Sequence, residues 1–402
     1  MNLSLLSLEF LSFSAVSVIL IAMLGGAARQ AVFLAINLLF VSHLLGPVGT
    51  AATLGFCVLG YGMTLAHLRW PSLQLAASLT AFVALFAYMR NYEFLQWLLP
   101  SDLLTGALRT VGLSFLFFKI IHVLIDARSG TLRRLEFPSY VNYCLAFTTF
   151  MMGPIQRYQD YWDQWHGARP AIAPTFEAHL DAGIRILVGL VKAYVLASVV
   201  NRLALQPGTD VVQLSLAGWL VKMYAFYFFL YLNFSGYCDV VIGIGSLFGV
   251  RPPENFNKPF IAQNISEFWQ RQHRSLTLWL TDYVFAPAYK QALTSRFLAG
   301  RALLAGNLTL MLTMVVSGLW HGTSIGFLVF GVVHGIYLVV YRSWDHLLIR
   351  RLGRKRVATI RKNLLAKGFG IFLTFNVVAF AFVFFRLDTP RLMALFHAWF
   401  GL

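Results

Sequence analysis

The sequence is poor in charge. Of its 402 residues only 12% are Asp, Glu, Lys or Arg, whereas 58% are hydrophobic. A soluble globular chain carries roughly 25% charged residues. Because the deficit extends along the whole chain, it excludes an ordinary soluble enzyme and predicts a protein that crosses the lipid bilayer many times.

Acidic residues are scarcer than basic ones, 16 against 32, and the formal net charge is +16. In a soluble protein this excess would suggest nucleic-acid binding. In a membrane protein it indicates cytoplasmic loops, where Lys and Arg accumulate. Residues 350–367 carry eight basic side chains and no acidic one, and we interpret them as a cytoplasmic loop near anionic headgroups. We therefore expect no nucleic-acid partner.

Several chemical motifs are missing. The three cysteines, Cys57, Cys144 and Cys238, are far apart and form no CxxC pair, so disulfides and a metal site are not expected. The chain has no GxxxxGK[ST] loop, no HExxH and no GxSxG. Acidic residues within apolar runs are few, Asp126 and Asp239, whereas an ion-coupled transporter usually needs more. A tightly bound cofactor is likewise not expected.

What the chain has instead is a series of long apolar runs. About 20 residues are needed to cross the ~30 Å hydrocarbon layer, and only helices or closed barrels satisfy their backbone groups there. We predict an all-α polytopic membrane protein with ten to twelve transmembrane helices, forming one domain over residues 1–402. The runs lie near 10–27, 30–47, 50–68, 71–89, 104–126, 138–155, 182–201, 211–232, 235–250, 303–320, 324–341 and 369–386.

Charge bias predicts an extracytoplasmic N-terminus, because the first basic residues, Arg29 and Arg69, follow apolar runs. Residues 251–290 are too polar to cross the bilayer but are rich in aromatic side chains. We expect them to form short helices that lie in the cytoplasmic interface or dip into it, with one helix beginning at Ser266.

The stretch SGLWHG, 317–322, interrupts the longest uncharged run, Leu303–Tyr341. As one helix this run would be about 58 Å long, too long for one span, so it must break there. The break leaves His321 between two helices, where it could face a cavity or simply hold the turn through a backbone carbonyl. His273, between Arg271 and Arg274, could be a second site residue or an ordinary interface residue. His334 follows thirteen residues after His321, on a different helical face at 100° per residue, and we assign it a packing role.

Six ordered motifs resemble the membrane-bound O-acyltransferase superfamily, in its bacterial branch that modifies cell-envelope polymers. That branch includes D-alanyl transfer to teichoic acids and O-acetylation of alginate. The motifs are GLSFLFFKIIHVLIDARSG (112–130), FTTFMMGPIQRYQDY (147–161), YLNFSGYCDVVIGIGSLFGVRPPENFNKPF (231–260), SEFWQRQHRSLTLWLTDYVF (266–285), SGLWHG (317–322) and FVFFR (382–386).

The resemblance implies a ring of tilted helices around a central channel, with His321 as the essential histidine and His273 as the second. A neutral imidazole suits the task, since acyl transfer from a thioester needs a base for the hydroxyl proton of the acceptor. His273 could orient the donor or donate to the developing oxyanion. The matched motifs also imply substrate-binding roles for Trp320, Trp269, Asn257, Asp239 and Ser317.

The predicted function is O-acyl transfer, of acetyl or D-alanyl type, across the bacterial inner membrane. The donor would be a cytoplasmic thioester, on a phosphopantetheine carrier protein or acyl-CoA, and the acceptor a hydroxyl of an extracytoplasmic glycan or envelope polymer. Two alternatives stay open at this point. One is a transporter or channel that hands the acyl group or polymer to a separate partner transferase, and the other is a scaffold of an export complex.

Overall fold

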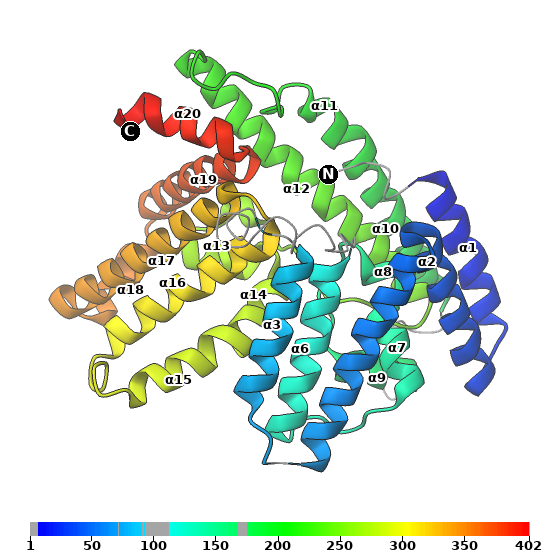
Figure 1. Ribbon diagram of the computed structural model, residues 1–402. Helices are drawn as coiled ribbons and strands as arrows, with labels where there is room; N and C mark the ends of the chain where they lie inside the picture. Colours follow the sequence, from blue (N-terminus) through cyan, green and yellow to red (C-terminus); the bar gives the residue numbers. More distant parts are fainter. Residues whose placement is uncertain (1–6, 71, 91, 93–111, 168–174, 402) are drawn as a thin grey trace. The chain divides into compact units, whose positions relative to one another are not determined.

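The computed structural model describes residues 7–70, 72–90, 92, 112–167 and 175–401. Within these ranges the secondary structure is helical and no strand occurs, which confirms the all-α membrane protein (Figure 1). The start of the expected apolar run 104–126 lies outside the described residues. The chain divides into two compact units, Met1–Val195 with Asn233–Glu254, and Leu196–Leu232 with Asn255–Leu402, here called unit 1 and unit 2.

Unit 1 contains the N-terminal helices. They are α1 (Leu8–Ala22), α2 (Gly26–Arg69), α3 (Leu75–Arg90), α6 (Leu113–Ser129), α7 (Phe137–Leu145), α8 (Phe147–Phe150), α9 (Tyr158–Trp165), α10 (Phe176–Leu190) and most of the π-helical turn η2 (Val191–Leu196). Helix α12 (Leu216–Leu247) begins in unit 2 and ends in unit 1.

Unit 2 contains the remaining elements. They are α11 (Ala197–Asn201), the 3₁₀ turn η3 (Pro259–Ile261), α13 (Ile265–Arg271), α14 (Arg274–Leu280), the π-helical turn η4 (Thr281–Phe285), α15 (Ala286–Thr294), α16 (Ala302–His321), α17 (Ile325–Leu352), α18 (Arg354–Lys362), α19 (Leu364–Arg386) and α20 (Thr389–Phe400).

Six helices of the described chain are long and apolar enough to cross a membrane, and α1 and α3 are shorter apolar helices. This finding does not count the crossings, because α2 alone covers two of the expected runs, so the ten to twelve spans stay a prediction. Helix α12 is continuous where two runs, 211–232 and 235–250, were expected, because its polar stretch at Asn233 and Ser235 stays helical inside the protein. Helix α2 likewise joins two runs across a kink, where Gly46 has φ 67° just before Pro47. A ring around a channel stays a prediction.

Buried polar side chains hold together the break between α7 and α8 in unit 1. Lys119 on α6 is 1% exposed, and its Nζ donates to the carbonyl oxygen of Tyr143 and to the hydroxyl of Thr149, both at 2.9 Å. It also donates to the carbonyl oxygen of Cys144 at 3.4 Å. The last carbonyls of a helix have no partner within the helix, so this ammonium group supplies the hydrogen bonds that end α7.

Helices α16 and α17 form an antiparallel hairpin in unit 2, in yellow and orange in Figure 1. Glycines allow the close approach, because a Cβ on Gly318 would lie 2.4 Å from the carbonyl oxygen of Phe327. A Cβ on Gly331 would lie 2.4 Å from the carbonyl oxygen of Met314. The hairpin confirms the predicted break after SGLWHG, since α16 ends at His321 and α17 begins at Ile325.

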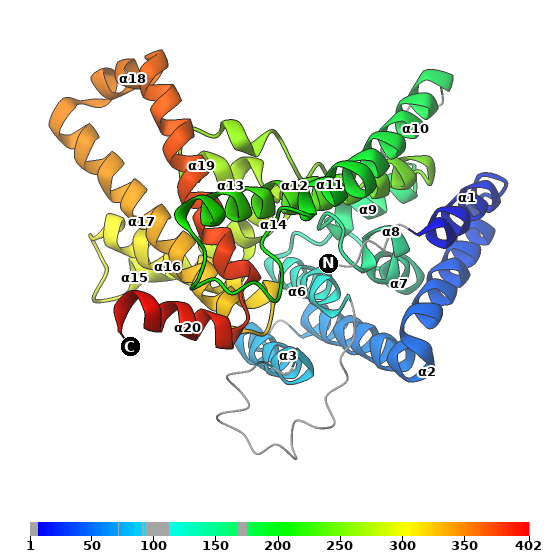
Figure 2. The ribbon, with the colours of Figure 1, turned by 90° about the horizontal axis from the view of Figure 1, so that it is seen from above.

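The basic stretch 350–367 is mostly helical, whereas we expected a loop. It comprises the end of α17, all of α18 and the start of α19 (Figure 2). Glycine at 353, with φ 78°, provides the sharp turn between α17 and α18. Good helix-forming residues such as Arg and Lys account for the helix that replaces the loop.

Candidate active site

His321 is the last residue of α16 and lies at the tip of the α16–α17 hairpin. Its ring contacts Trp320, with ring centroids 4.7 Å apart, and Phe385 on α19, with centroids 5.1 Å apart. The residue as a whole is partly exposed. His321 thus lies at the junction of α16 and α17, as the sequence predicted.

His273 lies between α13 and α14, where the chain turns sharply. Its backbone is in the left-handed region, with φ 47° and ψ 49°, which is uncommon for a residue with a Cβ and costs energy. Such strain persists only where the surroundings hold it. The backbone of Asn255 accepts from the Arg274 amide at 2.9 Å, and the Asn255 side-chain oxygen accepts from the amide of Ser275 at 3.1 Å.

The two histidines come together from different elements. The ring centroids of His273 and His321 are 6.2 Å apart, and the His273 ring is 5.7 Å from that of Trp320. His273 is only 4% exposed, and this burial, together with the neighbouring His321, holds its pKa well below the usual value. A neutral His273 carries one N–H donor and one acceptor nitrogen, as a group that orients a carbonyl requires.

The α13–α14 junction lies beside the end of α16 that His321 forms, and whether residues 251–290 lie in the interface or dip into it stays a prediction. His321 ends α16 at the opposite end from Arg301, which precedes the first residue of the helix. Because His273 contacts His321, the α13–α14 junction lies beside that remote end. Helix α13 begins at Ile265 with Asn264 as its cap, one residue before the predicted start.

The other predicted site residues differ in their surroundings. Trp320 contacts both histidines, and Ser317 is fully buried one helical turn before His321. Trp269 on α13 is 7% exposed and lies against His334, with ring centroids 5.0 Å apart. These residues all belong to unit 2. Their roles in binding substrate stay predictions.

Asn257 and Asp239 do not lie in this group of contacts. Asn257 is exposed, and its backbone amide donates to the carbonyl oxygen of Arg271 at 2.9 Å, which holds the turn that precedes His273. Asp239 belongs to unit 1, where its two carboxylate oxygens accept from Arg185 at 3.0 Å and from Lys192 at 2.7 Å. Both residues therefore have structural partners, and substrate binding by either stays a prediction.

Sequence reasoning missed two residues of the site. Asn255 was noted only as part of a motif, yet its side chain caps α14 next to His273. His334 was assigned to another helical face than His321, but that argument assumed one continuous helix. The hairpin reverses the chain, so both rings contact Phe330, with centroids 5.9 Å away for His321 and 4.5 Å away for His334.

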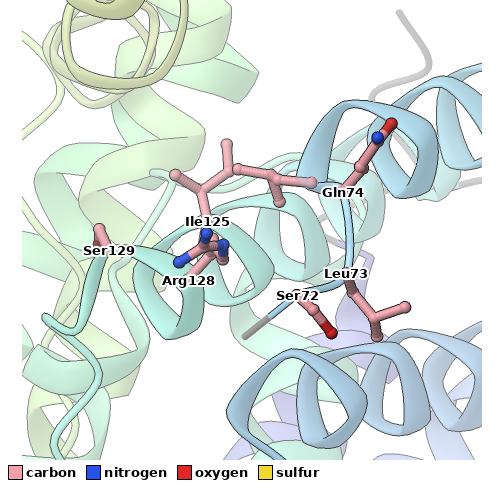
Figure 3. A pocket seen from close by; sticks show the side chains of 7 residues that line it. Ser72, Leu73, Gln74, Ile125, Arg128 and Ser129 are labelled. Atoms are coloured by element: carbon pink, nitrogen blue, oxygen red, sulfur yellow. The ribbon is translucent and has the colours of Figure 1, made fainter. Parts of the chain in front are cut away.

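A separate surface hollow belongs to unit 1. It measures about 490 Å³ and is lined by residues 72–75 and by Ile125, Arg128 and Ser129 of α6 (Figure 3). None of the candidate site residues lines it.

Comparison with known proteins decides the family. The model of the membrane-bound O-acyltransferase family matches residues 60–352. The chain belongs to the membrane-bound O-acyltransferase family. This confirms the resemblance inferred from the six motifs, and it makes the chain a multi-pass membrane acyltransferase.

Three similar proteins of this family have curated names. The chain is 29% identical over 288 residues, 69% of this chain and 68% of the relative, to a teichoic acid D-alanyltransferase of Streptococcus thermophilus. It is 33% identical over 258 residues, 61% of this chain and 47% of the relative, to a probable alginate O-acetylase of Pseudomonas fluorescens. A peptidoglycan O-acetyltransferase of Helicobacter pylori is 30% identical over 270 residues, 66% of this chain and 46% of the relative.

Proposed function

We propose that this acyltransferase moves an acetyl- or D-alanyl-type group from a cytoplasmic thioester to a hydroxyl of an envelope glycan or polymer outside the bacterial inner membrane. The observation that carries the proposal is the pair of imidazoles, His273 and His321, with ring centroids 6.2 Å apart in unit 2. The names of the similar proteins support an envelope polymer as acceptor. Either a phosphopantetheine carrier protein or acyl-CoA would provide this thioester.

In this mechanism His321 is the general base. It removes the proton of the acceptor hydroxyl, whose oxygen attacks the thioester carbonyl carbon. The neutral His273 donates its N–H to the carbonyl oxygen as negative charge develops there. When the C–S bond breaks, the thiolate takes back the proton from His321, so the imidazole returns to its neutral form.

Acyl transfer by the purified full-length protein in lipid nanodiscs tests the proposal. The donors are labelled acetyl-CoA in one arm and a labelled D-alanyl carrier-protein thioester in the other, each with a soluble glycan as acceptor. A covalent ester product without any other protein is expected in one arm. Movement of label without ester formation would instead favour a transporter that supplies a partner transferase.

The roles of the two histidines are tested by substitution in cells. We expect His321→Ala to lower ester-linked acyl groups on the envelope at least about 100-fold, the usual size of a general-base contribution. His346→Ala, at an exposed position on α17, is the control and leaves acylation unchanged. His273→Asn is preferred to Ala, because Asn tolerates the left-handed backbone. Unchanged acylation by His321→Ala at normal protein levels contradicts the assignment of the base.

A further inference from the structure

His334 is the second histidine of the α16–α17 hairpin and has no role in the mechanism above. It is 0% exposed and lies among the rings of Phe268, Trp269 and Phe330. Neither of its ring nitrogens has a hydrogen-bond partner among the described residues. Since buried polar groups are almost always paired, a buried imidazole without a partner among the described residues points to a ligand of another kind.

Three further side chains share this property, and one of them, Trp269, contacts the His334 ring. Within the described chain, the hydroxyl of Ser317, the Nε1 of Trp269 and the Oε1 of Gln272 are buried and have no hydrogen-bond partner. Ser317 lies on α16, Trp269 lies on α13, and Gln272 directly follows α13. With His334 they form a set that we call the deep polar cluster.

The deep polar cluster adjoins the histidine pair. Trp269 and His273 are four residues apart, and each faces a histidine of the hairpin: Trp269 is 5.0 Å from His334, and His273 is 6.2 Å from His321, between ring centroids. Ser317 lies one helical turn before His321, on the same side of α16. Members of the cluster therefore lie next to both histidines of the hairpin, Trp269 beside His334 and Ser317 one turn from His321.

The chemistry of the cluster fits water. It offers donors, the indole N–H and one imidazole N–H, and acceptors, the Gln272 oxygen and the other imidazole nitrogen. It carries no formal charge while His334 is neutral, so an ion gains little there. A buried water molecule typically makes about three hydrogen bonds to such groups. No group of His, Cys, Asp or Glu within the described ranges could hold a metal ion.

We propose that His334 is a positioning residue for acyl transfer. Its imidazole and the Ser317 hydroxyl bind water in a hydrogen-bonded row that reaches His321 and orients the His321 ring toward the acceptor hydroxyl. This rests on the proposed function of His321 as the base. If His334 served only to pack against its neighbouring rings, Phe at position 334 would support acyl transfer as well as His does.

Two substitutions separate hydrogen bonding from packing. His334→Phe keeps an aromatic ring and removes both nitrogens, whereas His334→Gln keeps a donor and an acceptor and loses the ring. We expect His334→Phe to lower kcat at least about tenfold with KM for the thioester within twofold, since misorientation of a base costs rate and not donor binding. His334→Gln is expected to keep at least a third of the rate. The thermal midpoints should follow the reverse order. We expect the midpoint of His334→Phe to equal or exceed that of wild type, and the midpoint of His334→Gln to equal it or lie below it.

The measurements use the full-length protein in membranes of a strain that lacks the chromosomal copy. Total alkali-labile acyl groups on the envelope are measured in the same strains, with His346→Phe as the matched histidine control. A His334→Phe variant within twofold of the wild-type rate, or a His334→Gln variant as slow as His334→Phe, overturns the inference.

Two results keep the test decisive. If His321→Ala leaves acylation unchanged, the proposed function fails; if His321→Ala abolishes acylation and His334→Phe does not lower it, only this inference fails. Should His334→Phe not accumulate in the membrane, Gln and Leu at 334 give the same comparison, since they have similar volumes and differ in hydrogen bonding. Equal rates for these two overturn the inference.

Discussion

Two clusters of buried polar side chains, one in each unit, differ in whether their atoms have protein partners. In unit 1, Asn37 donates to the Oδ1 of Asn142 at 3.1 Å and accepts from the Phe147 amide at 3.0 Å. Lys119 donates to two carbonyl oxygens and one hydroxyl. In the deep polar cluster of unit 2, the buried atoms of His334 and its neighbours have no such partners among the described residues.

This difference indicates a structural role for the cluster in unit 1 and a functional role for the deep polar cluster. A satisfied network stabilises a fold, because removing any member leaves another buried group without a partner. An unsatisfied group lowers stability, and natural proteins retain such groups mainly where function requires them. Substitutions of the hydrogen-bonded side chains in unit 1, Lys119, Asn37 and Asn142, should therefore lower stability. Substitutions in the deep polar cluster should instead lower the rate of acyl transfer.

Lys119→Met should have the largest effect. Methionine has a similar length but no donor, so the carbonyls at the end of α7 and the Thr149 hydroxyl lose their hydrogen bonds. We expect a loss of about 3 kcal/mol in stability, measured as a lower thermal midpoint and less protein in the membrane. Lys290→Met, at an exposed position, is the control. A variant as stable as wild type would remove the structural role of Lys119.

Asn37→Leu should cost about 2 kcal/mol, because it leaves the Phe147 amide and the Asn142 oxygen without partners. Asn142→Leu breaks the same pair. The double variant should cost less than the sum by about 1 kcal/mol, since both partners are then removed together. Strict additivity in a double-mutant cycle by thermal melting would show that the two side chains do not interact.

Ser317→Ala and Ser343→Ala should have opposite effects on stability and on the rate of acyl transfer. Ser317 has no partner among the described residues, whereas the Ser343 hydroxyl accepts from Asn307 at 2.9 Å. We expect Ser317→Ala to change stability by less than about 0.5 kcal/mol and to slow acyl transfer several-fold. Ser343→Ala should cost about 1 kcal/mol and leave the rate unchanged. The opposite pattern in paired melts and rate assays would contradict the comparison.

Glu254 in unit 1 should give the smallest effect. Its carboxylate accepts from Arg185 and Arg251, and the Arg185 hydrogen bond lowers its pKa to about 2. A lowered pKa in the folded state adds stability above the unfolded value and loses it as pH falls toward 2. Thermal midpoints of wild type and Glu254→Gln should therefore differ by a constant small amount from pH 5 to 8. They should converge below about pH 4.3, the usual Glu pKa. A difference that grows between pH 8 and 5 would exclude this ion pair as its source.

The helical membrane class was predictable because hydropathy alone decides which segments leave water. The same signal does not show where a helix continues, since it cannot tell a polar stretch inside a continuous helix from a loop, as at Asn233 in α12. The break after SGLWHG was predictable from length, because 39 uncharged residues are too many for one crossing.

The sequence by itself determined the family and pointed to His321 and His273, because six motifs in order resemble those of the family. Only the tertiary structure decided which residues lie together. Helical phase cannot be carried across a chain reversal, so the proximity of His321 to Phe330, and of His334 to Trp269 on α13, became visible only in the folded chain. Whether a buried polar atom is satisfied is likewise a property of its neighbours in space, and no residue type or spacing encodes it.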